Sequence, residues 1–477
     1  MEATEEATRS LVQTFCASDD LVLQSQMYLT EVLSSSERGK LLDEDEEVKG
    51  GLDDFQKSST KRVNFSRVKS DEFDLNKESR FHQQRRSDQE VITLVMYSTE
   101  SVIANSGGRM RGIESETYFP IVVSPLCSIL KDLHPECNLR VPAITRALAN
   151  MRLTPEFRSS EIFELQKFRP ATVDDIARVH ESAYVSGLEK AMDQASDQGL
   201  IFIDGSGPTY ATSTTFHESL LAAGAGISLV DVVVTVSKLS KDPPIGFALV
   251  RPPGHHAVPT GPMGFCVFGN VAIAARYAQR AHGLKRVFII DFDVHHGNGT
   301  NDAFYDDPDV FFLSTHQDGS YPGTGKINQI GHGLGEGSTL NLPLPGGSGD
   351  RAMRTVFDEV IAPCAHRFKP DIILVSAGYD GHVLDPLASL QFTTGTYYML
   401  ASNIKQLAKD LCGGRCVFFL EGGYNLTSLS HSVADSFRAF LGESSLASDF
   451  DNPAFLYEEP SNKVKEAIQR VKHLHSL

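Results

Sequence analysis

From about residue 118 onward, short runs of apolar residues alternate with stretches whose apolar residues recur at helical spacing. The apolar runs lie at 120–125, 245–254, 286–291, 309–314, 371–378 and 416–423, and each ends in glycine, proline or polar residues. Because these runs are apolar on both faces, they predict buried central strands of a parallel sheet. Helical patterns lie at 173–195, 217–238, 269–282, 351–367 and 461–473. The alternation predicts an α/β, doubly wound fold with helices on both faces of the sheet.

The N-terminal part of the chain has a different texture. Residues 41–90 contain 13 acidic and 10 basic residues, and their apolar residues show no sustained period. Such a segment cannot bury enough apolar surface to order itself. We therefore predict a charged, disordered N-terminal region over 1–115 and a catalytic domain over 116–477 that includes a C-terminal helix.

Composition restricts the class of protein. The chain carries 44 Lys and Arg against 61 Asp and Glu, a formal net charge of −17, so we expect no direct nucleic acid binding. No apolar run approaches the roughly 18 residues of a membrane span, so we expect no membrane insertion. The seven cysteines are scattered and odd in number, which is typical of a reducing, intracellular compartment. The acidic start, MEATEEATRS, favours cytoplasm or nucleus over an organelle such as a chloroplast or mitochondrion.

Residues able to do chemistry follow four of the predicted strands. Asp291, Asp293 and His295 follow the run at 286–291, and Asp380 follows the run at 371–378. The other two strands are followed by Tyr424 and by the pair His255 and His256. Parallel strands end at the same edge of a sheet, where such folds bind their ligands. The sequence therefore predicts one site built from four strand ends.

A metal site is the first part of this prediction. Asp293 and His295, two residues apart, combine with a carboxylate from another strand into a three-ligand set with one open position. Such a set is typical of a catalytic zinc ion, whose open position holds water, and the ligand types alone also allow manganese. If these residues only capped the next helix, the buried pair Asp291 and Asp293 would lack a cation, which is costly.

The remaining groups suit hydrolysis. His255 and His256 are candidate general bases, because an imidazole titrates near neutral pH, and Asp291 is placed to hold one of them through an N–H···O bond. Tyr424, after the flexible Gly422 and Gly423, is placed to donate its phenol proton to an oxyanion. A metal-activated water, a base and an oxyanion donor together predict hydrolysis of an amide or ester carbonyl. The spacing does not name the substrate.

The ordered motifs resemble those of one enzyme family. They are HPECNLRVP, GHHA, DFDVHHGNG, STHQDGSYPGTG, SAGYDGHVLDPL and LEGGYNL. They resemble the zinc-dependent histone deacetylase and acetylpolyamine amidohydrolase family, and most of all its class II-type members in plants. The resemblance covers roughly 130–445. It implies the arginase/deacetylase fold, with a central, mostly parallel sheet of about eight strands.

The resemblance also implies roles for individual residues. One zinc ion per chain would be held by Asp293, His295 and Asp380. His256 would be the main general base, with His255 paired to Asp291 and Tyr424 as the oxyanion donor. A substrate tunnel would be lined by Phe265, Tyr321, Gly254 and Leu387. A structural potassium ion would lie around Asp291, Asp293, His295 and Ser314.

Three positions refine these expectations. Asn298 stands where class I members have an aspartate, so His256 is expected to be less basic. Leu387 stands where members specific for acetylated polyamines tend to carry a glutamate, which favours acetyl-lysine. His382 stands where the related two-metal ureohydrolases have an aspartate, which favours one metal per chain.

The expected function is zinc-dependent removal of the acetyl group from acetyl-lysine in histones or other proteins. Two alternatives stay open. One is deacetylation of small N-acetylated amines, such as polyamines or aromatic amines, and the other is an acetyl-lysine-binding scaffold without catalysis. The expected partner is thus an acetylated protein or a small acetylated amine, and the sequence indicates no oligomeric state.

Overall fold

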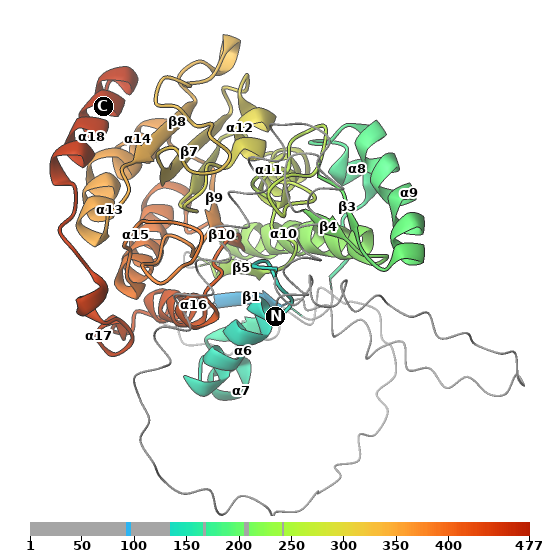
Figure 1. Cartoon of the computed structure of the whole chain (residues 1–477), viewed down its shortest axis with the longest axis horizontal. Coiled ribbons are helices and arrows are strands. Elements are labelled where there is room, and N and C mark those ends of the chain that lie inside the picture. The colour runs from blue at the N-terminus through green and yellow to red at the C-terminus, as the bar shows by residue number, and fades with distance from the viewer. Residues whose placement is uncertain (1–91, 97–133, 166–167, 205–208, 241–242) are drawn as a thin grey trace, which may run out of the picture. The chain divides into compact units, whose positions relative to one another are not determined.

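A central sheet of eight strands organises the protein (Figure 1). The structure is a computed structural model that describes residues 92–96, 134–165, 168–204, 209–240 and 243–477. In spatial order the strands are β2 (Ile162–Glu164), β1 (Ile92–Met96), β5 (Ile245–Leu249), β10 (Cys416–Leu420), β9 (Ile372–Ala377), β6 (Val287–Asp291), β7 (Val310–Gln317) and β8 (Thr339–Leu344). Every neighbouring pair is parallel. The predicted α/β fold with about eight strands is confirmed.

The four strands that carry the candidate chemistry are neighbours at the centre of the sheet. Strand β10 pairs with β5 on one side and with β9 on the other, and β9 in turn pairs with β6. Register places Val287 opposite Ile372 and Val417 opposite Leu374. The four strands are therefore aligned, and their carboxyl ends meet at one edge.

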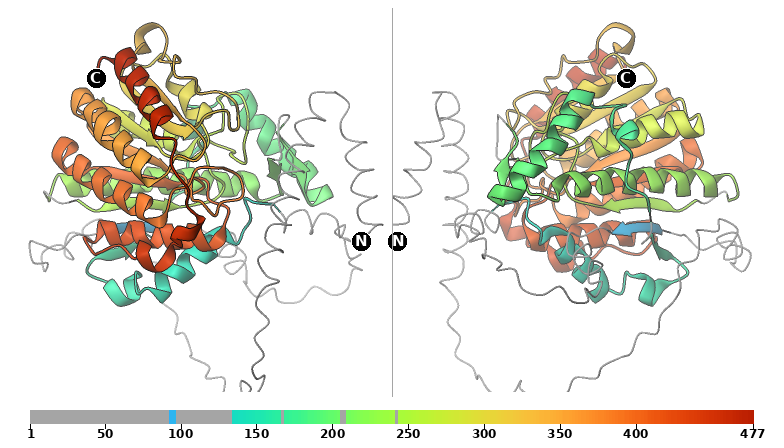
Figure 2. Two further views of the ribbon diagram at one scale, coloured as in Figure 1. Left: turned by 60° about the vertical axis from the view of Figure 1, so that its left-hand side comes forward. Right: turned by 90° about the vertical axis from the view of Figure 1, so that its right-hand side faces the viewer.

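Alternation along each strand divides the core into two layers. Phe247 and Leu249 of β5 point into one apolar cluster, and Ala248 points into the other. Helices α10 (Thr215–Ser237) and α11 (Asn270–His282) pack on the second cluster. The right view of Figure 2 shows these two helices, green and yellow-green, on one face of the sheet. Helices α6 (Arg140–Asn150), α15 (Thr394–Cys412), α16 (Leu426–Phe440) and α18 (Ser461–His475) pack on the first.

Shorter elements complete the described part of the chain. They are α7 (Pro155–Arg158), α8 (Val173–Ile176), α9 (Ser182–Gln198), the hairpin strands β3 (Ile201–Phe202) and β4 (Tyr210–Ala211), α12 (Asn298–Phe304), α13 (Asp350–Val356), α14 (Ala362–Phe368) and α17 (Ala447–Phe450). A π-helical turn, Phe357–Ile361, joins α13 to α14, and 3₁₀ turns lie at Gly333–Gly335 and Pro453–Phe455. The helices predicted at 217–238, 269–282, 351–367 and 461–473 correspond to α10, α11, α13 to α14, and α18.

Some elements differ from the sequence prediction. The sheet includes Ile92–Met96, so it begins upstream of the boundary predicted at residue 116. The rest of 1–115 and the strand predicted at 120–125 lie outside the described residues, so the predicted disorder stays a prediction. The sequence pattern also missed β2, a strand of three residues, and β8, whose Pro343 is tolerated because β8 lies at the edge of the sheet.

Helix α10 is the exception to the expectation that no segment could span a membrane. Within the described residues it is the one helix long and apolar enough to do so by length and composition. However, 61% of its apolar window is buried inside the protein, where it packs on β5, β10 and α11. That environment is typical of a core helix.

The helix predicted over 173–195 is broken, and the break places a histidine. The chain leaves α8 after Ile176 and starts α9 at Ser182, and His180 lies between them, 2% exposed. Its Nδ1–H donates to the carbonyl of Val258 at 3.0 Å, and its Nε2 accepts the N–H of Gly269 at 2.8 Å. His180 therefore ties this break to the loop after β5 and to the start of α11. Burial, opposed by the carbonyls of Val258 and Pro259, lowers the pKa of His180 to about 4.

This histidine makes stability depend on pH. Because its pKa is lower in the folded than in the unfolded chain, the unfolded chain binds the extra proton, and stability falls as the pH drops from 6.5 towards 4. In His180→Gln, unfolding should take up about one proton fewer. The free energy of unfolding should therefore fall by about 3 kcal/mol less between pH 6.5 and pH 4 than in the wild type. Urea unfolding at several pH values measures it, with His217→Gln, an exposed histidine of α10, as the control. An unchanged slope in His180→Gln would contradict the assignment.

Candidate active site

Three potential metal ligands converge at the carboxyl edge of the sheet. Single ligand atoms of Asp293, His295 and Asp380 all lie within 4.8 Å of one another, and all three side chains are buried. The Nδ1 of His295 is 3.3 Å from Oδ1 of Asp293 and 3.1 Å from Oδ2 of Asp380. Backbone N–H groups orient both carboxylates: Gly422 donates to Asp293 at 2.8 Å, and Val294 donates to Asp380 at 3.0 Å. The donor set and its support suit one divalent cation.

Two glycines make room for these carboxylates. A Cβ on Gly378 would lie 2.0 Å from Oδ2 of Asp293, and a Cβ on Gly422 would lie 2.0 Å from Oδ2 of Asp380. Gly378 comes directly after the last residue of β9, and Gly422 is the second residue after the end of β10. The glycines in SAGYD and LEGGY are therefore required by space at the site.

The electrostatics of this cluster also favour a cation. Neither Asp293 nor Asp380 has exposed surface. Burial and the charge of Asp293 raise the pKa of Asp380. Burial opposes protonation of His295, but the two carboxylates outweigh it and raise its pKa to about 10. A proton on His295 thus compensates part of the negative charge of the two carboxylates, and a divalent cation would compensate it with two positive charges.

A second group also brings ligand atoms together, but their bonding is already satisfied. His255, Cys266 and Glu421 are buried and have ligand atoms within 4.8 Å of one another. Glu421 accepts the N–H groups of Gly254 and His255 and the hydroxyl of Ser376. The thiol of Cys266 donates to the carbonyl of Gly264 and accepts the N–H of His256. This group is therefore a hydrogen-bonded support for the histidine loop.

The two adjacent histidines have different partners. His255 donates from Nδ1 to Oδ2 of Asp291 at 3.0 Å, whereas His256 donates from Nδ1 to Oδ1 of Asn298 at 2.7 Å. The amide of Asn298 is oriented by donating to the carbonyl of His256 and the sulfur of Met263. This orientation leaves Nε2 of His256 as an unprotonated nitrogen, the form that a general base needs.

The charges around the pair separate the two pKa values. Burial and the positive charges of His255 and His295 hold the pKa of His256 well below its usual range. Burial also opposes protonation of His255, but Asp293, Asp291 and Glu421 outweigh it and hold its pKa well above that range. The neutral imidazole is thus the one that faces an amide, and its low pKa comes from burial and the two neighbouring histidines, since the hydrogen bond to Asn298 acts in the opposite direction.

Tyr424 lies near the candidate metal ligands. Its ring lies edge-on to Phe265, with centroids 5.8 Å apart, and the guanidinium of Arg140 lies 5.2 Å from its ring centre. Burial and the charges of Asp380 and Asp293 hold the pKa of Tyr424 well above its usual range. The phenol therefore keeps its proton and can donate a hydrogen bond to a developing oxyanion.

The four residues expected to line a substrate tunnel differ in their surroundings. Phe265 contacts Tyr424, and Tyr321, 36% exposed, lies edge-on to His256 with centroids 5.1 Å apart. Leu387 is half-buried and follows Asp385-Pro386 in the loop after β9. Gly254 is buried, its N–H donates to Glu421, and a Cβ there would meet the backbone N of Asn270 at 2.5 Å. Its place in a tunnel wall stays a prediction.

Gly264 is the glycine that touches the candidate base. Its φ is +55°, and a Cβ would lie 2.5 Å from the ring of His256. This glycine belongs to the GFC motif, and the sequence pattern did not indicate its contact with His256. Spacing along a loop cannot tell which of two glycines turns back towards the ring.

A buried ion network that the sequence analysis did not assign supports the site. Arg140 donates to the carbonyls of Gly423 at 2.7 Å and Glu421 at 2.5 Å. Glu136, 4% exposed, pairs with Arg140 and with Arg251. Arg140 and Glu136 belong to the HPECNLR motif, and Arg251 precedes the histidine loop. The motif order was thus a signal for this network, although the contacts could be seen only in the fold.

Two further predictions concerned His382 and a structural potassium ion. The ring nitrogens of His382 face Asp451 and the N–H of Leu384, so His382 adds no second metal ligand. The Oγ of Ser314 is hydrogen-bonded to His316, and the potassium ion expected near it stays a prediction.

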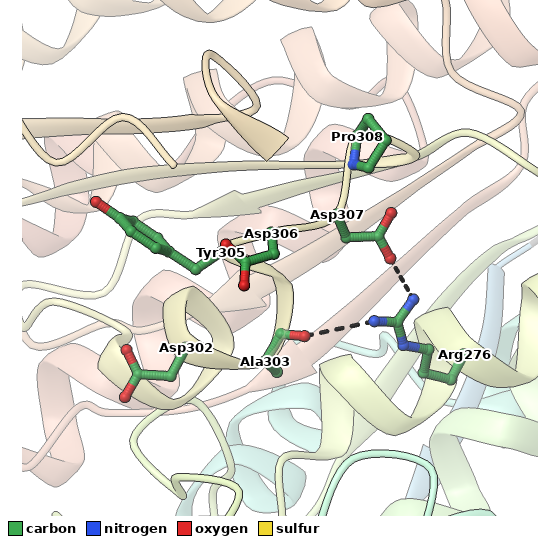
Figure 3. Close-up of a pocket in the computed structure, with 7 residues that line it drawn as sticks. All are labelled: Arg276, Asp302, Ala303, Tyr305, Asp306, Asp307 and Pro308. Atoms are coloured by element: carbon green, nitrogen blue, oxygen red, sulfur yellow. Dashed lines mark hydrogen bonds and ion pairs between the residues drawn. The ribbon is translucent and has the colours of Figure 1, made fainter. Parts of the chain in front are cut away.

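One surface pocket lies apart from these residues (Figure 3). It is lined by Arg276, Asp302, Ala303, Tyr305, Asp306, Asp307 and Pro308. Arg276 donates to Asp307 and to the carbonyl of Ala303, so part of its acidic lining is already paired. It shares no residue with the candidate site.

Comparison with known proteins identifies relatives of the whole domain. Residues 134–440 match the family model described as the histone deacetylase domain. The chain is 77% identical over 347 residues to "Histone deacetylase 14, chloroplastic" of Arabidopsis thaliana, covering 73% of this chain and 82% of that one. It is 73% identical over 354 residues to "Histone deacetylase 10, chloroplastic" of Oryza sativa subsp. japonica, covering 74% and 80%. The crystal structure of the HDA15 HD domain matches with a TM-score of 0.61 at 34% identity, covering 72% of this chain and 90% of that one.

The metal site predicts a specific loss. Asp380→Asn keeps the shape of the ligand but removes its charge, so metal affinity should fall about 100-fold or more. After dialysis, elemental analysis should find about one metal ion per wild-type chain and much less in the variant. Asp435→Asn, at a buried aspartate of α16 bonded to Ser445 and Leu446, is the matched control. Full metal content in Asp380→Asn would contradict the site.

Proposed function

The chain belongs to the histone deacetylase family and is an amidohydrolase, and on this premise we propose that it removes acetyl groups from acetyl-lysine side chains of proteins with one zinc ion per chain. The observation that carries this proposal is that Asp293, His295 and Asp380 come together beside His256, whose ring centre lies 6.0 Å from that of His295 and whose Nδ1 bonds to Asn298. A zinc ion held there would polarise the acetyl carbonyl and lower the pKa of an attacking water.

The residues of this chain would then divide the proton transfers. His256 accepts a proton from the water at Nε2 as the water's oxygen bonds to the carbonyl carbon. Tyr424 donates a hydrogen bond to the carbonyl oxygen as negative charge grows on it. When the C–N bond breaks, the amine nitrogen takes a proton from a protonated histidine. The products are acetate and an unacetylated lysine side chain. Asp291 keeps His255 oriented and charged beside this sequence of steps.

The walls favour a long, neutral acyl-amine stem. Phe265 and Tyr321 present aromatic faces near the two candidate catalytic groups, Tyr424 and His256. Leu387 offers no carboxylate to a second amine, so a polyamine would lack a distal partner at this position. Small aromatic N-acetylamines would fit the same walls, and this is the alternative that the substrate experiment separates.

The compartment is part of the proposal. Two similar proteins carry the word chloroplastic in their names, against the preference for cytoplasm or nucleus drawn from the first residues. We propose the chloroplast, to be tested by imaging the full chain fused at its C-terminus to a fluorescent protein.

A substrate panel tests the activity itself. The zinc-loaded protein should hydrolyse acetyl-lysine peptides with a kcat/KM at least about tenfold higher than acetylated polyamines, because the second amine of a polyamine would lack a partner at Leu387. Aromatic N-acetylamines are included in the panel as the small-molecule alternative. Release of acetate is the measurement. Hydrolysis of the small amines alone would move the assignment to a small-molecule deacetylase, and binding of peptides without hydrolysis would support the scaffold alternative.

The oxyanion donor has its own test. Tyr424→Phe removes one hydroxyl, so kcat should fall about 100- to 1000-fold while metal content stays unchanged. Tyr398→Phe removes another half-buried hydroxyl, bonded to the carbonyl of Glu443, and should retain wild-type kcat. A wild-type kcat in Tyr424→Phe would remove Tyr424 from the mechanism.

A further inference from the structure

Asp385 is a buried carboxylate outside the metal site that gathers backbone N–H groups from two loops. It is 6% exposed and lies between β9 and α15. Its Oδ1 accepts the N–H of Leu387 at 3.0 Å. Its Oδ2 accepts the N–H of Tyr424 at 2.7 Å and that of Asn425 at 3.4 Å. One side chain therefore joins the loop after β9 to the loop after β10.

The segment that carries Tyr424 cannot fix the phenol by itself. Gly422 and Gly423 precede it, and Gly423 has a φ of +118°, a conformation that residues with a side chain rarely adopt. Two clamps compensate. Arg140 holds the carbonyls of Glu421 and Gly423, and Asp385 holds the N–H groups that follow. Removing either clamp would let the Tyr424 backbone move.

The same carboxylate also holds the backbone of Leu387, a residue expected to line the substrate tunnel. Leu387 is half-buried, and Leu384, in the same loop, is 39% exposed. Because Oδ1 and Oδ2 belong to one rigid group, the position of Leu387 is linked to that of Tyr424. A substrate stem that packs on this loop would therefore meet a phenol already held in place.

We propose that Asp385 is a positioning residue that sets the Tyr424 hydroxyl and the rim residue Leu387 in register for the reaction. The inference rests on the proposed function, in which Tyr424 donates to the carbonyl oxygen. A carboxylate is needed because both of its oxygens accept, whereas an amide would turn an NH₂ group towards a backbone N–H.

A double-mutant cycle tests this role. Asp385→Asn should lower kcat on an acetyl-lysine peptide about 10- to 100-fold, since a misplaced catalytic group costs that much, with metal content unchanged. In a Tyr424→Phe background the same change should lower kcat less than about twofold, because there is no hydroxyl left to misplace. If Asp385→Asn does not fold, Asp385→Ser, which keeps one acceptor, should show the same non-additivity.

A matched control separates positioning from general stability. Glu459 also accepts three backbone N–H groups, those of Gly349, Arg351 and Ala352 at the start of α13. Glu459→Gln should lower the unfolding temperature but keep kcat and KM within about twofold of wild type.

The outcomes distinguish the two proposals. A wild-type kcat in Asp385→Asn, or an undiminished loss in the Tyr424→Phe background, would overturn the role of Asp385 and leave the proposed function intact. A wild-type kcat in Tyr424→Phe would instead overturn the mechanism on which the inference rests.

Discussion

The site depends on the burial of two carboxylates around one imidazole. Asp293 and Asp380 have no exposed surface, and their ligand atoms lie within 4.8 Å of that of His295. Two buried like charges are unfavourable unless a cation and hydrogen bonds compensate them. The N–H groups of Gly422 and Val294 donate to the two carboxylates, and Gly378 leaves the space that Asp293 occupies. A metal ion bound between the carboxylates would compensate their remaining charge. Burial and the positive charges of His255 and His295 hold the pKa of His256 low. Burial and the negative charges of Asp380 and Asp293 hold the pKa of Tyr424 high.

Strand order explains how one edge collects these groups. Strands β5, β10, β9 and β6 are neighbours and parallel, although they are far apart in sequence. Their loops are then tied together by charged side chains that bind backbone rather than metal. Glu421 holds the histidine loop, Arg140 holds the carbonyls before Tyr424, and Asp385 holds the N–H groups of Tyr424 and Asn425. The catalytic groups are thus positioned by neighbouring loops more than by their own.

The sequence predicts the buried parts well because their physical signal is local. Runs such as RVFIID are apolar on both faces, and the polar residues at their ends predict the candidate site. The signal fails where it depends on partners. Strand β2 has only three residues, and Pro343 in β8 is allowed only because that strand is at an edge. The break at His180 contains neither glycine nor proline, and Gly254 and Gly264 differ only in which way the loop turns.

The proposed activity depends on one metal ion held by Asp293, His295 and Asp380. Anomalous diffraction from crystals of the zinc-loaded protein, collected on both sides of the zinc absorption edge, tests it directly. We expect one anomalous peak per chain, bound by these three side chains. A peak among His255, Cys266 and Glu421 in its place, or a second peak of equal height, would contradict it.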